Sequence, residues 1–311
     1  MTAPVRVHAV VVNWNGGPLN LACVESLLAQ GIAAECVHFV DNASRDGSRE
    51  LVEGAHPDLC FLHNEQNLGF GAAANQGARA ALDAGAEAVF FVNNDLTLPA
   101  GNLDALLEGL DRHPRAGFVG PRVLDAADPT RVWCAGGTLS WRQNLSTLRG
   151  HGRRDGDEFR REVRMDYLPG CALLARRACL EEVGLFDDDY FAYMEDVDLG
   201  VRAGDAGWES WLIGGASAHH ASSSATGGGY NPRRKYMMGV NSIWFLRTHG
   251  STSAWLRFIA FDILSLPFVW LARAPRGGSR SVAAKALGIL AGLRGKRVQA
   301  TDLEPGGTRL W

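Results

Sequence analysis

VRVHAVVVNWNGGPLNLACVESLLAQGIAAECVHFVD, residues 5–41, holds a predicted strand, helix and strand in direct succession. The β-branched run at 5–12 is typical of a buried strand, and the turn-forming WNGGP ends it. Apolar residues at helical spacing follow over 19–30, and 36–40 is a second short strand. The same alternation continues to a strand at 88–92. It predicts an α/β fold with a mostly parallel sheet covered by helices on both faces.

The composition is that of an ordinary folded protein. The chain has 311 residues, of which 46% are hydrophobic and 21% charged, and its formal net charge is -3. This length suits one large α/β domain, or a domain with an appended module. The slight negative charge argues against a surface that binds duplex nucleic acid, so we expect no nucleic-acid partner. The six cysteines form no CxxC pair, which favours buried reduced thiols over a zinc or redox site.

The alternation of strands and helices stops after about residue 120. Residues 141–165 are polar and Arg-rich, and we expect a mobile loop or an irregular insertion there. A strand and a helix return between residues 167 and 184, and another helix follows an acidic turn. The N-terminus has no basic region leading into an apolar run with a cleavage site, so cytoplasmic residence is expected.

Polar groups follow three of the predicted strands. Ligands of an open parallel sheet bind beyond the carboxyl ends of its strands, so these positions are candidate binding residues. They are Asp41 in DNASRDGS, Asn67 and Gly69 in NLGFGAAANQG, and Asp95 in NND. Gly69 allows the backbone to approach a ligand, and Asp95 is placed to hold a hard divalent ion with substrate phosphate oxygens. Asx turns, helix caps and strand-ending turns explain the same residue types, so both interpretations stay open.

The segment FDDDYFAYMEDVDLGVR, residues 186–202, carries six carboxylates among aromatic side chains. A solvated acidic surface would hold fewer aromatics, and a carboxylate against aromatic surfaces can gain the basicity wanted of a general base. Glu195 and Asp196 are the candidates for that role, whereas residues 187–189 suit a turn. Further along, His219 and His220 are either metal or phosphate contacts or ordinary polar loop residues.

In their order these motifs resemble the family-2 inverting glycosyltransferases with a GT-A (Rossmann-like) fold, and among them the rhamnosyltransferase-like branch. The matching segments are VVVNWNG, VDNASRDGS, NLGFGAAAN, VNNDL, LPGCALLARR, GLFDDDYFAYMEDVDLGVRAGDAGW, and then HH with a Ser cluster. The resemblance runs from about residue 10 to about residue 248. It implies a catalytic domain over residues 1–248 and leaves residues 249–311 as a C-terminal helical extension.

The resemblance also implies roles residue by residue. Asp196 corresponds to the catalytic base, with Glu195 as its neighbour. The residues that correspond to the binding site of a nucleotide-diphosphate sugar donor are Asn13, Asp41, Asn67, Gly69 and Asn94. A divalent cation, Mg²⁺ or Mn²⁺, corresponds to Asp95 and His220, with His219 as the alternative histidine. The family's metal motif begins with aspartate, and the neutral Asn93 at that position predicts weak metal binding without the substrate diphosphate.

The activity that the resemblance implies is transfer of a sugar to a hydroxyl of a glycan or lipid-linked acceptor, in cell-wall or surface polysaccharide synthesis. Rhamnose from dTDP-rhamnose is the first choice of donor, and a UDP-sugar is the alternative. A catalytically inactive sugar-nucleotide-binding protein is the alternative from another class. A nucleotidyltransferase would need a basic Gly-rich loop after the first strand, and a dinucleotide oxidoreductase would need GxGxxG there; WNGGPLN is neither.

The C-terminal stretch WLRFIAFDILSLPFVWLA, residues 255–272, has the length of a short transmembrane helix. It contains Arg257, Asp262 and Pro267, which disfavour a span, so we expect association with the inner surface of the cytoplasmic membrane. The aromatic residues suited to the headgroup boundary are Trp255, Phe258, Phe261, Phe268 and Trp270, and the basic residues that would meet anionic lipid are Arg273, Arg276 and Arg280. The alternatives are a helix packed on the catalytic domain and a homodimer contact.

Overall fold

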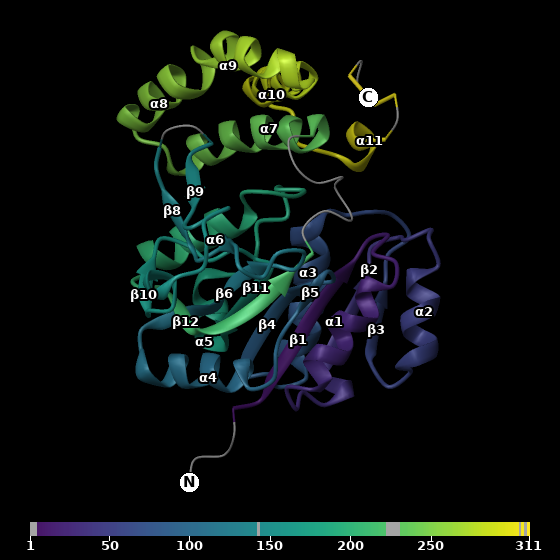
Figure 1. The fold of residues 1–311 in the computed structure, drawn as a ribbon. Helices are drawn as coiled ribbons and strands as arrows, with labels where there is room; N and C mark the ends of the chain where they lie inside the picture. The colour runs from purple at the N-terminus through teal and green to yellow at the C-terminus, as the bar shows by residue number, and fades with distance from the viewer. Residues whose placement is uncertain (1–4, 142–143, 222–230, 305, 308–309) are drawn as a thin grey trace.

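The computed structural model describes residues 5–141, 144–221, 231–304, 306–307 and 310–311 (Figure 1). Its centre is a ten-stranded sheet in the order β10-β12-β6-β11-β4-β1-β2-β3, with β5 beside β12 and β7 beside β6. The strands of this sheet are β1 (Val7–Asn13), β2 (Val37–Asp41), β3 (Cys60–His63), β4 (Ala88–Asn93), β5 (Leu96–Thr97), β6 (Ala116–Asp125), β7 (Val132–Cys134), β10 (Val163–Met165), β11 (Ala172–Arg176) and β12 (Glu209–His220).

The first half of the chain builds the parallel side of the sheet. Strands β3, β2, β1 and β4 lie side by side in that order, and every pairing among them is parallel. Strand β11 is antiparallel to both of its neighbours, β4 and β6, whereas β12 runs parallel to β6. The predicted α/β class is confirmed. The strands are parallel from β3 to β4, as the sequence predicts, and beyond β4 the sheet is mixed.

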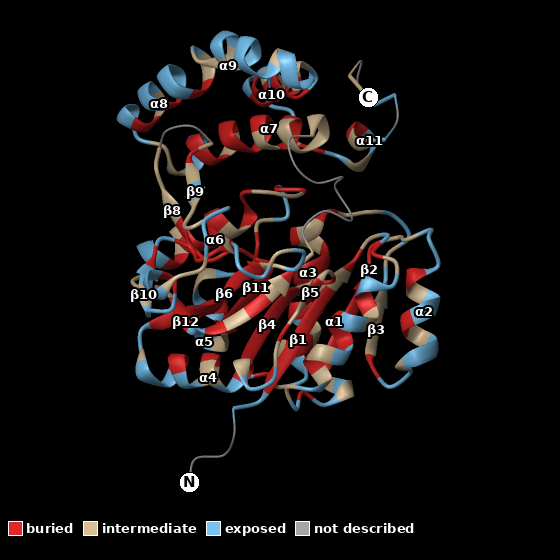
Figure 2. Ribbon diagram, viewed as in Figure 1, coloured by how far each residue is buried: buried red, intermediate tan, exposed pale blue. Residues whose placement is uncertain are grey.

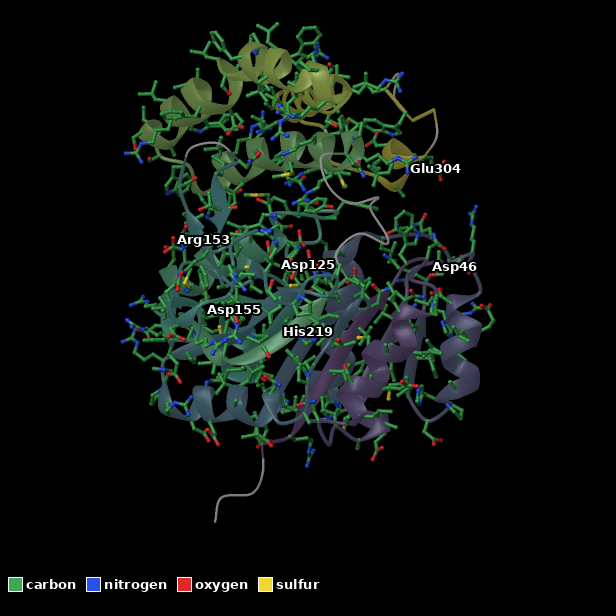
Figure 3. The ribbon with its side chains drawn as sticks, viewed as in Figure 1. Asp46, Asp125, Arg153, Asp155, His219 and Glu304 are labelled. Atoms are coloured by element: carbon green, nitrogen blue, oxygen red, sulfur yellow. The ribbon has the colours of Figure 1, made fainter. Side chains whose placement is uncertain are left out.

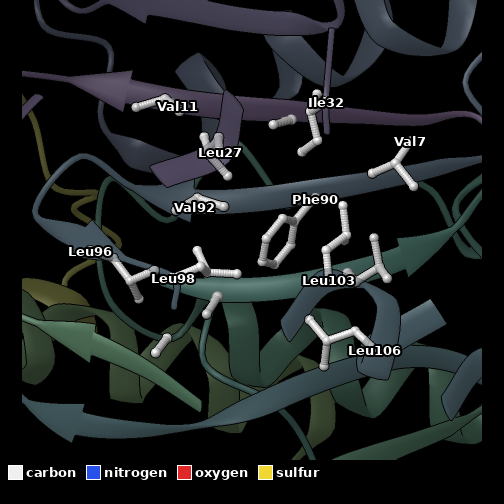
Figure 4. Close-up of a cluster of buried hydrophobic side chains, with 14 of the residues drawn as sticks. Val7, Val11, Leu27, Ile32, Phe90, Val92, Leu96, Leu98, Leu103 and Leu106 are labelled. Atoms are coloured by element: carbon white, nitrogen blue, oxygen red, sulfur yellow. The ribbon is translucent and has the colours of Figure 1, made fainter. Parts of the chain in front are cut away.

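Helices cover both faces of the sheet, as predicted. They are α1 (Leu19–Leu28), α2 (Ser48–Ala55), α3 (Phe70–Asp83), α4 (Asn102–Arg112), α5 (Arg177–Val183) and α6 (Glu195–Asp205), with short 3-10 turns η1 (Ala34–Cys36) and η2 (Asp157–Phe159). Val11 of β1 faces the core built with α1 and α4 (Figure 4), and its neighbour Val10 faces the core built with α3, α5 and α6. Both faces of β1 are therefore buried, which explains the three consecutive valines at 10–12.

A helical layer lies at the end of the molecule opposite the N-terminus, and β1 points toward it (Figure 1). It consists of α7 (Pro232–His249), α8 (Thr252–Phe258), the π-helical turn η3 (Ile259–Ile263), α9 (Leu266–Arg273), the 3-10 turn η4 (Ala274–Arg276), α10 (Ser279–Leu293) and α11 (Ala300–Leu303). Glycines let α7 and α10 approach closely: a Cβ on Gly288 would lie 2.1 Å from the Tyr236 carbonyl oxygen. The predicted domain boundary at residues 248–249 falls at the end of α7 and divides this helix from its packing partner.

Of the two expectations for 141–165, the described part of the segment is an insertion and not a mobile loop. It contains β9 (Ser146–Leu148), which forms a two-stranded hairpin with β8 (Gly137–Leu139), and it ends in β10 of the main sheet. Asp155, labelled in Figure 3, forms an ion pair of 3.2 Å with Arg122, and both side chains are only 10% exposed. Arg149 and Arg153 flank the buried Phe159 ring. The arginines of this segment therefore make contacts within a folded insertion.

The C-terminal apolar segment packs one side on the helical layer and leaves the other exposed. Phe258, predicted to face lipid, is instead fully buried in a core with residues of α7 and α10, and Trp255 is partly buried beside it. Phe261, Phe268 and Trp270 are exposed, as predicted. Within the described residues, one helix, Thr252–Arg276, is apolar enough to cross a membrane by length and mean hydropathy, 1.6, a criterion that core helices of soluble proteins also meet.

Candidate active site

Three predicted donor-site residues meet in one hydrogen-bond network at the carboxyl ends of β1, β2 and β4. The Asn13 side chain is fully buried, and its amide nitrogen donates to the Asp41 carboxylate at 2.9 Å and to the Ser48 hydroxyl at 2.9 Å. Its amide oxygen accepts from the Asn94 side chain and the Gly16 backbone N–H, both at 3.1 Å. Parallel strand ends share one edge of a sheet, which is why residues from three strands converge here.

Asn67 and Gly69 belong to a second network, centred on Asn42. The Asn42 amide nitrogen donates to the Asn67 side-chain oxygen at 2.8 Å and to the Gly69 carbonyl at 3.1 Å. Its backbone N–H donates to the Asn13 carbonyl at 2.8 Å, so the two networks are joined. Sequence reasoning missed Asn42, although its place directly after Asp41 in the DNAS motif was a signal.

Gly69 has a structural requirement of its own. Its φ is +88°, and a Cβ there would lie 2.3 Å from the Phe191 carbonyl oxygen. The Phe70 backbone N–H donates to that same oxygen at 2.7 Å. Gly69 therefore lets the turn before α6 pack directly on the start of α3.

The three residues of the NND motif contact two different parts of the site. Asn94 joins the Asn13 network, whereas Asp95 and Asn93 contact His220 at the end of β12. The His220 Nε2 lies 2.9 Å from an Asp95 carboxylate oxygen and 3.4 Å from the Asn93 side-chain nitrogen. The Trp133 ring stands nearly perpendicular to the imidazole, with the two ring centroids 4.4 Å apart.

His220 and His219 face opposite sides of the sheet because neighbouring residues of a strand alternate. His220 is 5% exposed and contacts Asp95, while His219 (labelled in Figure 3) is half-buried and paired in register with Thr97 of β5. The geometry therefore favours His220 as the histidine beside Asp95. The Ser cluster of the predicted motif, within 222–230, lies outside the described residues.

The donor set at Asp95 and His220 fits a divalent ion that takes most of its ligands from substrate and water. No group of three or more His, Cys, Asp or Glu side chains suited to a metal occurs among the described residues. The Asp95 carboxylate matches the way Mg²⁺ is held in phosphate-transferring sites, by one or two carboxylates plus phosphate oxygens. The buried His220 Nδ1 has no hydrogen-bond partner in the described part of the chain.

Glu195 and Asp196 begin α6 and follow a backbone turn with two strained residues. Tyr193 and Met194 have φ values of +70° and +80°, a region that costs non-glycine residues on the order of 1–3 kcal/mol each. The Asn241 side chain of α7 donates to the Ala192 carbonyl at 2.9 Å and to the Tyr193 carbonyl at 2.8 Å. A residue far along the chain thus holds the strained turn in place, and sequence reasoning missed it.

The two adjacent carboxylates have different surroundings. Asp196 is half-buried, and its oxygens accept from the Val197 backbone N–H at 2.8 Å and the Gly170 backbone N–H at 3.2 Å. Burial nevertheless raises the pKa of Asp196 to about 6. Glu195 is 7% exposed, and its Oε2 has no hydrogen-bond partner among the described residues. Burial, and after it the neighbouring Asp196, raises the pKa of Glu195 well above its ordinary value.

The remaining carboxylates of this segment have structural partners. Asp198 accepts from His249 and from Arg202, each at 2.7 Å, and these bonds hold its pKa below the ordinary value although burial acts to raise it. Residues 187–189 suit a turn, as predicted: Asp187 accepts the Asp189 backbone N–H, Asp188 accepts from Asn75, and Asp189 pairs with Arg297. Asp196 is therefore the carboxylate of this segment that combines partial exposure with a pKa suited to a base.

A family model described as "Glycosyl transferase family 2" matches residues 9–183, more than half of the chain. The chain belongs to this family. The matched residues contain the networks around Asn13 and Asn42 and also Asp95, whereas Glu195, Asp196 and His220 lie beyond them. This glycosyltransferase is 34% identical over 242 residues to an N-acetylglucosaminyl-diphospho-decaprenol L-rhamnosyltransferase of Mycobacterium tuberculosis, covering 70% of the chain and 76% of the relative.

Other relatives of this glycosyltransferase are more distant. It is 29% identical over 210 residues to the galactofuranosyltransferase GlfT1 of Mycolicibacterium smegmatis, covering 65% of the chain and 66% of that protein. The mannosyltransferase PcManGT of Pyrobaculum calidifontis, solved with GDP-Man and Mn²⁺, superposes with a TM-score of 0.56 at 18% identity, covering 95% of this chain and 89% of that one. GalNAc-T7, solved with UDP, GalNAc and Mn²⁺, superposes with a TM-score of 0.58 at 12% identity, covering 79% and 50%. The predicted GT-A fold and family are confirmed.

Proposed function

We propose that this glycosyltransferase moves L-rhamnose from dTDP-rhamnose to a hydroxyl of a lipid-linked acceptor in cell-wall polysaccharide synthesis, with inversion at the anomeric carbon. The observation that carries the chemistry is Asp196, a half-buried carboxylate at the start of α6 whose pKa, about 6, lies near neutrality. A general base works best when its pKa is close to the operating pH. The choice of sugar and acceptor rests on the name of the rhamnosyltransferase relative at 34% identity.

The proposed reaction is a single displacement. The acceptor hydroxyl oxygen attacks the anomeric carbon from the face opposite the nucleotide, and the bond from that carbon to the diphosphate oxygen breaks. Asp196 takes the hydroxyl proton, while its two backbone N–H donors keep the carboxylate oriented toward the acceptor. The transition state resembles the oxocarbenium ion of glycosidases. We assign Glu195, which is buried next to Asp196 at the start of α6, the role of its orienting neighbour.

On the donor side, we assign the nucleoside contact to Asp41 and the lining of the donor pocket to Asn13, Asn67, Gly69 and Asn94. Asp95 and His220 would hold a Mg²⁺ or Mn²⁺ ion. When bound, this ion supplies charge neutralisation to the departing diphosphate. His219 has no part in that arrangement, because it faces the other side of β12.

The proposed acceptor also implies where the enzyme works. A lipid-linked acceptor is confined to a membrane, so a cytoplasmic enzyme that uses it would act at the inner membrane surface. The exposed apolar side chains of α8 and α9 support this placement of the helical layer. A homodimer through the same face remains the alternative prediction.

The deciding experiment incubates the purified enzyme and Mn²⁺ with dTDP-rhamnose, UDP-galactose, UDP-galactofuranose and GDP-mannose, each with a water-soluble N-acetylglucosaminyl-diphospho-alkyl acceptor. The expected result is a rhamnosylated product, with the configuration at the anomeric carbon opposite to that in the donor by NMR. Preference for another donor would reject the rhamnose assignment, and retained configuration would reject the single displacement. If neither transfer nor donor hydrolysis occurs with any donor, the chain is a binding protein instead of an enzyme.

A further inference from the structure

Arg234, in the first turn of α7, lies beside the turn that precedes Asp196. Its guanidinium carbon is 5.2 Å from the centroid of the Tyr193 ring. Tyr193 comes three positions before Asp196 in the chain, and Asn241, on the same helix as the arginine, holds its carbonyl. An arginine held against an aromatic ring by cation–π attraction keeps its N–H groups available for hydrogen bonds. The structure therefore places a cation next to the proposed catalytic base.

Arg234 forms no ion pair with any of the described residues, which include every Asp and Glu of the chain, and the same holds for Arg233 beside it. The Arg234 Nε is buried and has no hydrogen-bond partner in the described part of the chain. Positive charge in the first turn of a helix is unfavourable for the helix itself, and the first turn of α7 holds no acidic residue. The stability of α7 therefore does not explain these two arginines, whereas a bound anion would neutralise their charge.

The acceptor of the proposed reaction supplies such an anion. A hydroxyl of the acceptor sugar meets Asp196 in that reaction, and the soluble acceptor of the deciding experiment carries a diphosphate between this sugar and its alkyl chain. The guanidinium group binds phosphate oxygens through two parallel charged hydrogen bonds. Arg234 lies beside the same turn as Asp196, so it can bind the diphosphate while the sugar contacts the base.

The lipid chain of such an acceptor also has an apolar surface nearby. Lys235, the next residue of α7, lines a small cavity together with Val269 of α9, so α9 lies close to this end of α7. Phe268 and Leu271 of α9 are 73% and 63% exposed. Figure 2 shows α8 and α9 largely exposed along the outer edge of the helical layer. A lipid joined to a diphosphate at Arg234 would therefore meet exposed apolar side chains that suit a membrane surface.

We propose that Arg234 binds the diphosphate of the lipid-linked acceptor, with Arg233 adding positive charge, and that it selects acceptors whose sugar is joined to the lipid through a diphosphate. This inference rests on the acceptor class of the proposed function. Arg234 takes no part in proton transfer, since it holds the diphosphate and thereby positions the sugar hydroxyl at Asp196. The sugar, the diphosphate and the lipid chain then contact the turn before α6, Arg234 and α9, in that order.

The donor also contains a diphosphate, so the test titrates acceptor and nucleotide separately into the full chain by calorimetry. The N-acetylglucosaminyl-diphospho-alkyl compound and an alkyl N-acetylglucosaminide without the diphosphate are titrated in EDTA, because the proposed binding of the donor diphosphate depends on a metal ion. The nucleotide dTDP is titrated with Mn²⁺. The variants are Arg234→Gln and Arg234→Lys, and the matched control is Arg257→Gln, an exposed arginine of α8 without an ion pair among the described residues. Thermal unfolding of each variant checks its folding.

We expect the wild type to bind the diphosphate compound at least about 10-fold more tightly than the alkyl N-acetylglucosaminide, the scale of a charged hydrogen-bonded contact. Arg234→Gln should lose most of this preference and keep dTDP binding within about twofold of the wild type. Arg234→Lys should keep part of the preference, because the charge stays while the paired hydrogen bonds are lost. The control Arg257→Gln should bind all three compounds as the wild type does. A purely structural role of Arg234 would instead weaken binding of both sugar compounds alike.

Several results would overturn the assignment. They are an unchanged preference in Arg234→Gln, no preference in the wild type, and equal losses in Arg234→Gln and Arg257→Gln. Weaker dTDP binding by Arg234→Gln with unchanged acceptor binding would assign the arginine to the donor diphosphate instead. The proposed function can fail separately: a preference that depends on Arg234, in an enzyme that does not use dTDP-rhamnose, would reject the donor and keep the diphosphate site. Rhamnosyl transfer by Arg234→Gln with the acceptor KM of the wild type would do the reverse.

Discussion

Two parts of the candidate site are held by different means. They are the proposed donor edge of the sheet, around Asn13 and Asp41, and the proposed catalytic turn, residues 192–196 at the start of α6. At the donor edge, neutral amides and hydroxyls surround Asp41, and Asn13 uses both ends of its amide to join three strands. In the catalytic turn, two residues with positive φ precede two adjacent carboxylates, and Glu195 Oε2 lacks a partner among the described residues. Many hydrogen bonds hold the residues around Asp41 in place. In the turn, few contacts hold a strained backbone and two adjacent carboxylates. Single substitutions should therefore have their largest effects in the turn.

The largest effect is expected for Asp196→Asn. The amide keeps the shape but cannot take a proton, so transfer should fall by about 100-fold or more, the scale for removing a positioned general base. Donor affinity, measured by calorimetry, should stay within about twofold, since the donor networks are untouched. The matched control is Asp189→Asn, in the same turn, whose carboxylate is 60% exposed and pairs with Arg297. Near-normal turnover of Asp196→Asn would end the assignment of the base.

A smaller effect, on donor binding and metal response, is expected at Asp95. Asp95→Ala should weaken dTDP-rhamnose binding in Mn²⁺ by about 10- to 100-fold, the range for losing a charged hydrogen-bonding or metal-binding group. Binding of dTDP-rhamnose by this variant should then change little when EDTA is added. His220→Ala should show part of the same loss, and His219→Ala should not, because the two histidines face opposite sides of β12. Full activity of the wild-type enzyme in excess EDTA would reject the metal role.

Asn241→Ala tests whether the helical layer maintains the catalytic turn. Removing the two hydrogen bonds to the Ala192 and Tyr193 carbonyls should lower kcat by about 10-fold while leaving donor KM unchanged. A positioning role predicts a changed pH profile as well. In the wild type, kcat/KM should rise as pH increases through about 6, where Asp196 loses its proton, and in the variant this rise should move. A loss of stability with an unchanged pH profile would leave Asn241 a purely structural role.

Sequence periodicity was enough to bring the proposed donor-site residues together. It did not reveal which contacts hold the turn before α6. Asp41 and Asp95 follow buried strands, and periodicity alone places strand ends at one edge of a parallel sheet. The antiparallel direction of β11 leaves no such trace, because an apolar strand buried on both faces has the same pattern in either direction. Asn241 acts across 48 residues of chain, and its signal was only a polar residue within the apolar sequence MMGVNSIWF. A hydrogen bond such as that from Asn241 to Tyr193 arises from tertiary packing, and periodicity along the chain does not predict it.

The smallest effect is expected from Glu195→Gln, and it concerns stability. Because burial and Asp196 raise the folded-state pKa of Glu195, the folded protein binds this proton more tightly than the unfolded chain, whose glutamate pKa is about 4.3. The stability that this residue contributes is present below the unfolded pKa and is lost as pH rises through the folded pKa. Glutamine carries no charge at any pH, so the variant should avoid that loss.

Thermal unfolding of wild type and Glu195→Gln at two pH values measures this difference. At about pH 8 the variant should melt about 1–2 °C higher, the shift expected from roughly 1 kcal/mol in a chain of this size, and at about pH 4 the two proteins should melt together. Turnover of Glu195→Gln should fall less than that of Asp196→Asn, since Glu195 only orients its neighbour; a larger fall would exchange the two roles. A lower melting temperature of the variant at pH 8 would mean that the charged Glu195 has a stabilising partner, which would contradict its raised pKa.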